Sequence, residues 1–161
     1  MLMNESIAVR RLHRTREAGV AAVEFAIILP LMITLIAFPL FFGRVFMFYS
    51  VAQKSAHNSA IYLSKIPLVE MQDVAKSAAA ATLTSELVAA TIEELHPGSR
   101  GAIQTQIDCD DGPCGTGVPT YISVHVRVKM YDELFNFFTS PILGDEGIQL
   151  KAKVTMKYVG T

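Results

Sequence analysis

A long apolar segment, Val20–Phe42, constrains this sequence more than any other feature, because Glu24 is its only charged residue. As a helix rising about 1.5 Å per residue it spans roughly 35 Å, enough to cross the hydrocarbon core of a bilayer. Pro30 and Pro39 are compatible with this assignment, since membrane helices tolerate proline. The sequence therefore predicts a transmembrane helix over residues 20–44, with Val20–Gly43 as the membrane-spanning part.

The charges on either side of this segment predict its orientation. Basic residues stay on the cytoplasmic side of a membrane, and four arginines precede the segment: Arg10, Arg11, Arg14 and Arg16. Beyond the segment Arg44 stands alone. We therefore expect residues 1–19 to form a basic cytoplasmic leader of a single-pass inner-membrane protein with a periplasmic C-terminal domain. A cleaved secretory signal is disfavoured, because its apolar core has about 7–15 residues and a small-x-small site follows it.

Glu24 lies one turn into the apolar segment, where a charged group costs free energy to insert. One interpretation places it in the first helical turn, favoured by the helix dipole and near the lipid headgroups. The other is that its carboxylate awaits a cationic partner within the membrane. The acid alone favours the first interpretation.

The residues around Glu24 change that balance. Gly19 separates the basic leader from the apolar segment, and Glu24 is the fifth residue after it. This arrangement resembles the processing site of type IV pilin-like precursors. The longer stretch AGVAAVEFAIILPLMITLIAFPLFFGRVF, followed by SVAQKSAHNSAIYLS, resembles the TadE-like family, the minor pseudopilins of the tight-adherence (Flp-type) pilus. The resemblance is specific from Ala18 to about Ser64.

The resemblance implies both a processing step and an assembly role. A prepilin peptidase would cut between Gly19 and Val20 on the cytoplasmic side, and Glu24 would then pair with the new α-amine of a neighbouring subunit. Major pilins of these systems carry a Glu-Tyr pair, whereas this chain has Glu24–Phe25 and is far longer, which favours a minor component. The implied partners are the membrane, the peptidase, other pilin-like subunits and the inner-membrane assembly platform; entry into the filament is left open.

The expected chemistry agrees with that implication. Cutting after Gly19 would remove the four arginines and leave an ammonium group on Val20. A carboxylate and an ammonium attract strongly in a low-dielectric layer, although each loses hydration there. An unprocessed, membrane-anchored periplasmic binding or sensor domain is the alternative function.

Beyond the membrane segment the helical pattern continues over residues 45–66. Apolar and small residues recur at spacings of three or four: Val45, Phe48, Tyr49, Ala52, Ala56, Ala60 and Leu63. We therefore expect one helix from about Ala18 to Ser64, ended by Pro67. A second helix is expected near Val69–Leu95, with a possible break at Thr84 and Ser85, which could cap a new helix.

The last third of the chain changes to a period of two. Residues 102–108, 121–131 and 148–159 alternate apolar and polar side chains, which predicts three strands of an antiparallel sheet with one buried face. The fold class is thus α+β, with residues 67–161 as the extracytoplasmic domain. The apolar stretch between the last two strands contains Leu134, Phe135, Phe137 and Phe138, which we expect to pack in the core rather than form an exposed partner patch.

Cys109 and Cys114 lie in a short glycine-containing segment between the first two strands. Outside the cytoplasm such a pair is expected to form a disulfide. A metal site using Asp108, Asp110 and Asp111 is the rival, but no second Cys or His pair has the spacing of ligands.

The sequence motifs that carry enzymatic chemistry are missing. There is no phosphate-binding glycine loop, no H-E-x-x-H and no G-x-S-x-G. The net charge is −1 and basic residues do not cluster with aromatic ones, which argues against nucleic-acid binding. We therefore expect neither an enzyme nor a site for a cofactor, a metal or a small-molecule substrate.

Overall fold

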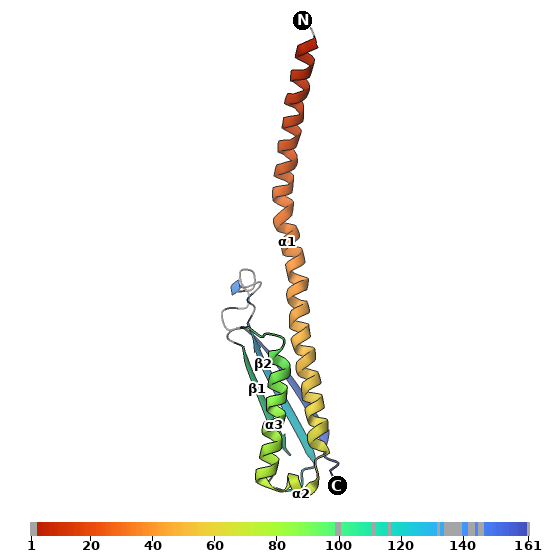
Figure 1. Cartoon of the computed structure of the whole chain (residues 1–161), viewed down its shortest axis with the longest axis vertical. Helices are drawn as coiled ribbons and strands as arrows, with labels where there is room; N and C mark the ends of the chain where they lie inside the picture. Colours follow the sequence, from red (N-terminus) through yellow and green to blue (C-terminus); the bar gives the residue numbers. More distant parts are fainter. Residues whose placement is uncertain are drawn as a thin grey trace. The chain divides into compact units, whose positions relative to one another are not determined.

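A computed structural model of the 161-residue chain describes residues 3–98, 101–110, 112–115, 117–131, 133, 140–141, 144 and 147–160, with side chains from Gly19 onward. The chain divides into two units, residues 1–42 and 43–161. Figure 1 shows the order of the helices and strands. The expected packing of Leu134, Phe135, Phe137 and Phe138 lies outside the described residues.

The first unit is the N-terminal part of helix α1, Met3–Ser64. The helix begins fifteen residues before the expected start near Ala18. The reason is that no proline or glycine occurs between Met3 and Ala18, so nothing in the leader interrupts helical geometry. Pro30 and Pro39 both lie within the helix and do not end it.

Apolar side chains cover this part of α1 and remain exposed. Val20, Ile27 and Leu31 are 61%, 71% and 64% exposed, and most apolar residues up to Phe42 are also exposed, whereas Ala37 and Phe41 are buried. Within the described residues one helix, Gly19–Ser64, is long and apolar enough to cross a membrane, with a mean hydropathy of 2.6 in its best window. A single-pass membrane anchor fits these properties.

The second unit begins with the C-terminal part of α1, which packs through one face. Five residues of the predicted stripe are buried: Phe48, Ala52, Ala56, Ala60 and Leu63. Val45 is half-buried. The prediction is wrong for Tyr49, which is exposed and accepts a hydrogen bond from Gln53 Nε2 at 2.9 Å. Small residues on the buried face allow the helix to approach its neighbours closely.

The predicted second helix is two helices, α2 at Leu68–Met71 and α3 at Val74–Glu93. Asp73 separates them because its extended backbone makes it the N-cap of α3, where its carboxylate accepts from Ala75 N at 2.9 Å and Lys76 N at 3.3 Å. The helix does not break at Thr84 and Ser85. Their hydroxyls instead donate within the helix to the carbonyl oxygens of residues 80 and 82.

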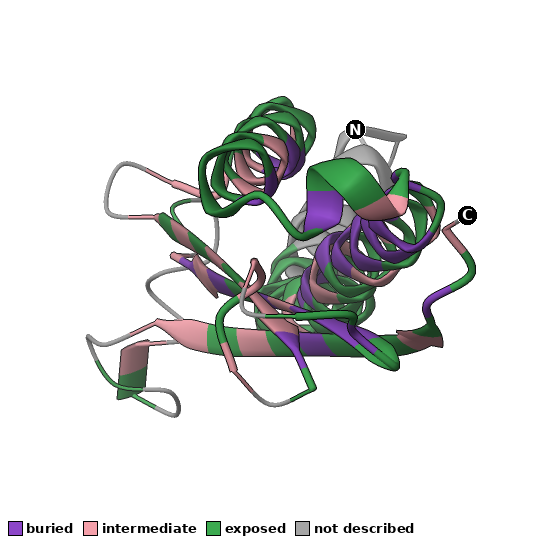
Figure 2. Cartoon of the chain, turned by 90° about the horizontal axis from the view of Figure 1, so that it is seen from below, coloured by how far each residue is buried: buried purple, intermediate pink, exposed green. Residues whose placement is uncertain are grey.

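Three strands, β1 (Ala102–Cys109), β2 (Tyr121–Met130) and β3 (Ile148–Lys157), form an antiparallel sheet in the order β1-β2-β3. The predicted inward face of the central strand is confirmed, since each of its members is at most 1% exposed: Ile122, Val124, Val126, Val128 and Met130. The helices cover one side of this sheet (Figure 2). The fold is α+β, as expected.

The residues after β3 return to the end of α1. Val159 N donates to Ser64 O at 3.0 Å, and the Tyr158 hydroxyl donates to Ile66 O at 2.7 Å. Burial raises the pKa of the Tyr158 phenol, which keeps the donating proton in place. These bonds close the second unit by joining its last strand to its first helix.

Candidate functional site

The four residues of the predicted processing and recognition site all lie on α1. Gly19 is helical, and a side chain placed on it would meet no other atom within 4 Å. Glycine inside a helix costs about 1 kcal/mol relative to alanine. No packing contact requires a glycine here, and the glycine lowers the helix propensity of the chain at the predicted cut.

Glu24 and Val20 are separated by one helical turn. Residues four apart share a helix face and differ by about 6 Å along the axis. Glu24 is exposed, as are Val20 at 61% and Phe25 at 65%. Among the described residues, none bonds to the Glu24 carboxylate. A carboxylate on an exposed apolar helix is thus open to a partner from outside the chain.

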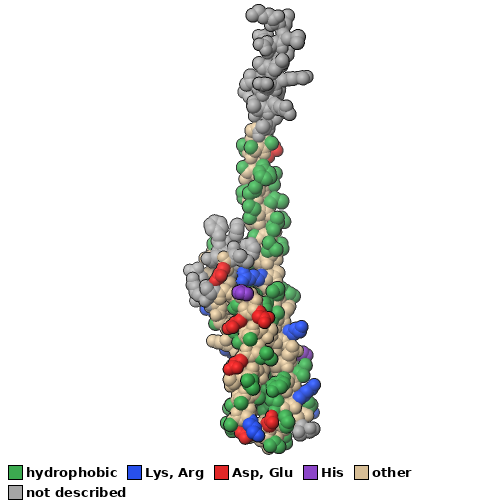
Figure 3. Space-filling view, in the orientation of Figure 1, with side chains coloured by type: hydrophobic (Ala, Val, Ile, Leu, Met, Phe, Trp, Pro, Cys, Tyr) green, Lys and Arg blue, Asp and Glu red, His purple; other side chains and the backbone are tan. Residues whose placement is uncertain are grey.

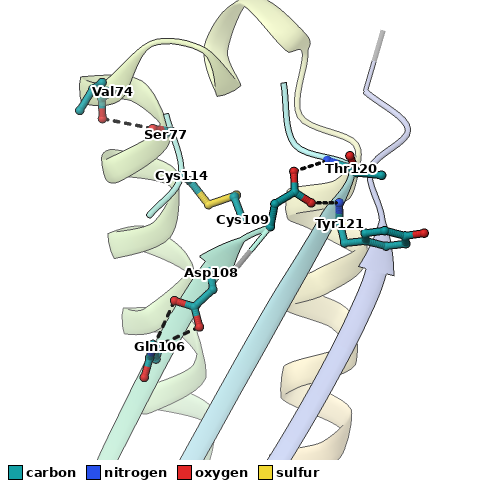
Figure 4. The surroundings of a disulfide bond; sticks show 9 residues. Val74, Ser77, Gln106, Asp108, Cys109, Cys114, Thr120 and Tyr121 are labelled. Atoms are coloured by element: carbon teal, nitrogen blue, oxygen red, sulfur yellow. Dashed lines mark hydrogen bonds between the residues drawn. A yellow bond between two sulfur atoms is a disulfide. The ribbon is translucent and has the colours of Figure 1, made fainter. Parts of the chain in front are cut away.

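The two cysteines form a disulfide between the end of β1 and the loop that follows it. Cys109 and Cys114 are bonded, with their Cα atoms 4.9 Å apart (Figure 4). The disulfide prediction is confirmed. Because both sulfur atoms are used in this bond, neither is available as a thiolate ligand, and the metal interpretation of the pair is wrong. Asp111 lies outside the described residues.

Asp110 holds this loop to the start of β2, a role that the sequence analysis missed. Its carboxylate accepts from Thr120 N at 2.7 Å and Tyr121 N at 2.8 Å, while its own N–H donates to Tyr121 O at 3.1 Å. Its φ of 51° is in the left-handed region, which Asp tolerates better than most residues. An Asp directly after a strand is typical of turns, because its side chain can bond to nearby backbone N–H groups, and could have indicated this role.

The disulfide loop also packs against the N-terminus of α3. A Cβ on Gly115 would lie 2.7 Å from Ser77 Oγ and 2.9 Å from Val74 Cα, and its φ is +97°. Any larger residue would therefore displace the loop from the helix. The crosslink holds the loop in the conformation that makes this contact.

We expect thiol labelling of the native protein without reductant to modify neither Cys109 nor Cys114. The bond closes a short loop, so its loss should lower the free energy of unfolding by about 2 kcal/mol. Labelling followed by mass spectrometry of the membrane-extracted protein makes the measurement, with fully reduced, denatured protein as the reference. Two reactive thiols in the native protein would contradict the crosslink.

A groove of about 560 Å³ runs between α1 and α3. Tyr62, Leu83 and Leu87 line it with exposed apolar surface. Lys54 is the only charged residue of its lining, so the groove does not bring ionisable groups together for chemistry.

One protein-family model, described as TadE-like protein, matches residues 19–60. No curated protein and no solved structure matches the chain. The family match starts at Gly19, includes Glu24 and Phe25, and continues along α1 to Ala60. It indicates association with a tight-adherence pilus system and its membrane. Residues 19–60 of this chain, which make up most of α1 from Gly19 onward, are thus similar to the TadE-like family.

Proposed function

We propose that this protein is a minor pseudopilin of a tight-adherence pilus, a structural rather than enzymatic component that acts in pilus assembly, initiation or anchoring. The observation that carries the proposal is the position of the family match. The match begins at the glycine predicted to precede the cut and contains the glutamate at the fifth position after it.

The exposed helix surface supports this proposal. A helix that buried its apolar face in its own domain would leave Val20, Phe25 and Ile27 covered, whereas all three are more than half exposed. Lipid and the membrane helices of neighbouring subunits are the surroundings that such a surface requires. The four leader arginines favour a cytoplasmic N-terminus in the inner membrane, with the second unit in the periplasm.

Two features favour a minor over a major subunit. Phe25 lacks the phenol of the Glu-Tyr pair that the resemblance associates with major pilins. The chain also carries a disulfide-crosslinked α+β unit after its membrane helix, which provides a separate surface for partners. We propose that these partners are other pilin-like subunits and the inner-membrane assembly platform.

Replacing Gly19 by valine should block processing in cells that contain the prepilin peptidase. The branched side chain hinders close approach of the enzyme to the backbone, and the leader should remain attached. N-terminal sequencing should give Val20 for the wild-type protein and an uncut leader for Gly19→Val, with a corresponding rise in apparent mass.

Gly43→Val is the matched control. Gly43 is also a glycine inside α1 whose side-chain position is open, so both substitutions change helix propensity alike. Gly43→Val should be cut normally. An intact leader in the wild-type protein would reject the processing step and favour the unprocessed membrane-anchored binding or sensor domain.

A further inference from the structure

The side of the sheet that faces away from the helices is basic. In β2 the residues that alternate with the buried apolar set point outward, and β3 continues the same face. We call this surface the basic sheet face; it consists of Arg127, Lys129, Lys151, Lys153 and Lys157. Arg127, Lys151 and Lys153 are exposed, and within the described residues none of these three forms an ion pair.

The pairing of the strands places like charges directly opposite each other. Arg127 pairs with Lys151. His125, on the same face, lies beside an acid instead, with its Nε2 3.6 Å from Asp108 Oδ2. Like charges opposite each other destabilise a sheet. Lysines on an edge strand can prevent edge-to-edge aggregation, but this accounts only for β3, whereas Arg127 and Lys129 are on the central strand. The edge strand β1 has no lysine at all. An anionic surface that covers this face would offset the repulsion.

The chain itself carries an anionic surface on the opposite side. Glu86 and Glu93 are exposed on α3, two turns apart and therefore on one side of the helix, and Glu94 follows at its C-cap. We call these three residues the acidic helix face. Acidic side chains gather along the side of the molecule that carries α3 (Figure 3). The chain is nearly neutral overall, with a net charge of −1. The basic sheet face and the acidic helix face nevertheless carry opposite charges, although the helices also carry Lys54 and Lys76 and β1 carries Asp108.

We infer that the basic sheet face binds the acidic helix face of a second copy of this chain. The helices cover one side of the sheet (Figure 2). The basic face is the other side, so the two surfaces cannot meet within one molecule. The contact is therefore head-to-tail, and each bound pair leaves one free basic face and one free acidic face. An anionic lipid surface would cover the basic face equally well but would leave the acidic helix face without a partner, so a second copy accounts for both.

This inference does not depend on the pilus role and is tested on the full chain in neutral detergent micelles. Raising the salt from about 0.1 M to about 1 M shortens the Debye length from about 10 Å to about 3 Å, so association measured by energy transfer between labelled copies should weaken. Two variants each reverse the charge of one surface: R127E/K151E/K153E for the basic sheet face, and E86K/E93K/E94K for the acidic helix face. Each variant alone should associate at least about tenfold more weakly than the wild type, because like charges then face each other.

Mixing the two variants is the decisive experiment. The reversed sheet of one variant then faces the reversed helix of the other, and association should return to near the wild-type level. Association that remains in either variant alone measures what the membrane helices contribute. The inference is overturned if the mixture associates no better than its components. Acylation of the β3 lysines in micelles doped with phosphatidylglycerol tests the lipid alternative. The inference is also overturned if these micelles protect the lysines equally in the wild type and in E86K/E93K/E94K while the protein copies do not associate.

Discussion

Cells whose only copy of this protein carries Glu24→Gln should insert it, cut it after Gly19, fold its second unit and yet fail to make pili. Glutamine keeps the size and polarity of the side chain but removes its charge. The attraction to a partner's ammonium group is then lost, while insertion into the membrane becomes easier. Piliation and copurification with partner pilins are the measurements, and we expect both to fall to the level of a deletion strain.

The control is Glu17→Gln, which removes an acid from the leader and should leave piliation normal. The competing explanation of Glu24, as a residue that complements the helix dipole, predicts a loss of only a few tenths to about 1 kcal/mol of helix stability. Normal piliation of the Glu24→Gln strain with normal processing would therefore leave Glu24 as a helix-start residue. Loss of pili without loss of copurification with partner pilins would indicate that Glu24 pairs with the α-amine of Val20 in its own chain, one turn away.

Replacing Phe48 by alanine should lower the free energy of unfolding of the second unit by about 3–5 kcal/mol, the largest stability effect we expect. Phe48 is 1% exposed on the buried side of α1, and the Arg44 guanidinium lies 5.9 Å from its ring centroid. The substitution would leave a cavity on the buried side of α1. Pulse proteolysis of the detergent-solubilised chain across a urea series measures the shift.

Phe46→Ala is the matched control, because Phe46 is the same residue type two positions away and is 71% exposed. Its loss should change the free energy of unfolding by no more than about 0.5 kcal/mol. Equal destabilisation by the two substitutions would contradict the packing of α1 described above.

The spacing of apolar residues along the sequence predicts which helices and strands form better than it predicts where each of them begins and ends. Alternation identified the buried face of β2 completely, because a central strand packs every second side chain against the helices. Spacing alone misplaced Tyr49, since positions at the margin of a helical stripe satisfy the same spacing whether or not a neighbour covers them. The split at Asp73 was missed because an acid near a helix start is favourable both inside the first turn and as an N-cap.

The candidate sites differ in how far apart their residues lie along the sequence. Gly19, Val20, Glu24 and Phe25 are neighbours along the chain, so the pattern could be read directly. Asp110 bonds to residues ten and eleven positions away, and Arg127 faces Lys151 only through the register of two strands. Such contacts depend on tertiary pairing, which composition and period do not specify.

The bonds that join the end of β3 to the end of α1 have a mechanical consequence. A pull on α1 along its axis reaches Ser64 and Ile66, whose carbonyl oxygens accept from Val159 N and the Tyr158 hydroxyl. Tension therefore passes from α1 directly to the residues after the last strand of the sheet, and does not have to pass through α2, α3 and the disulfide loop. The sheet can bear force while the intervening helices remain relaxed and available to a partner.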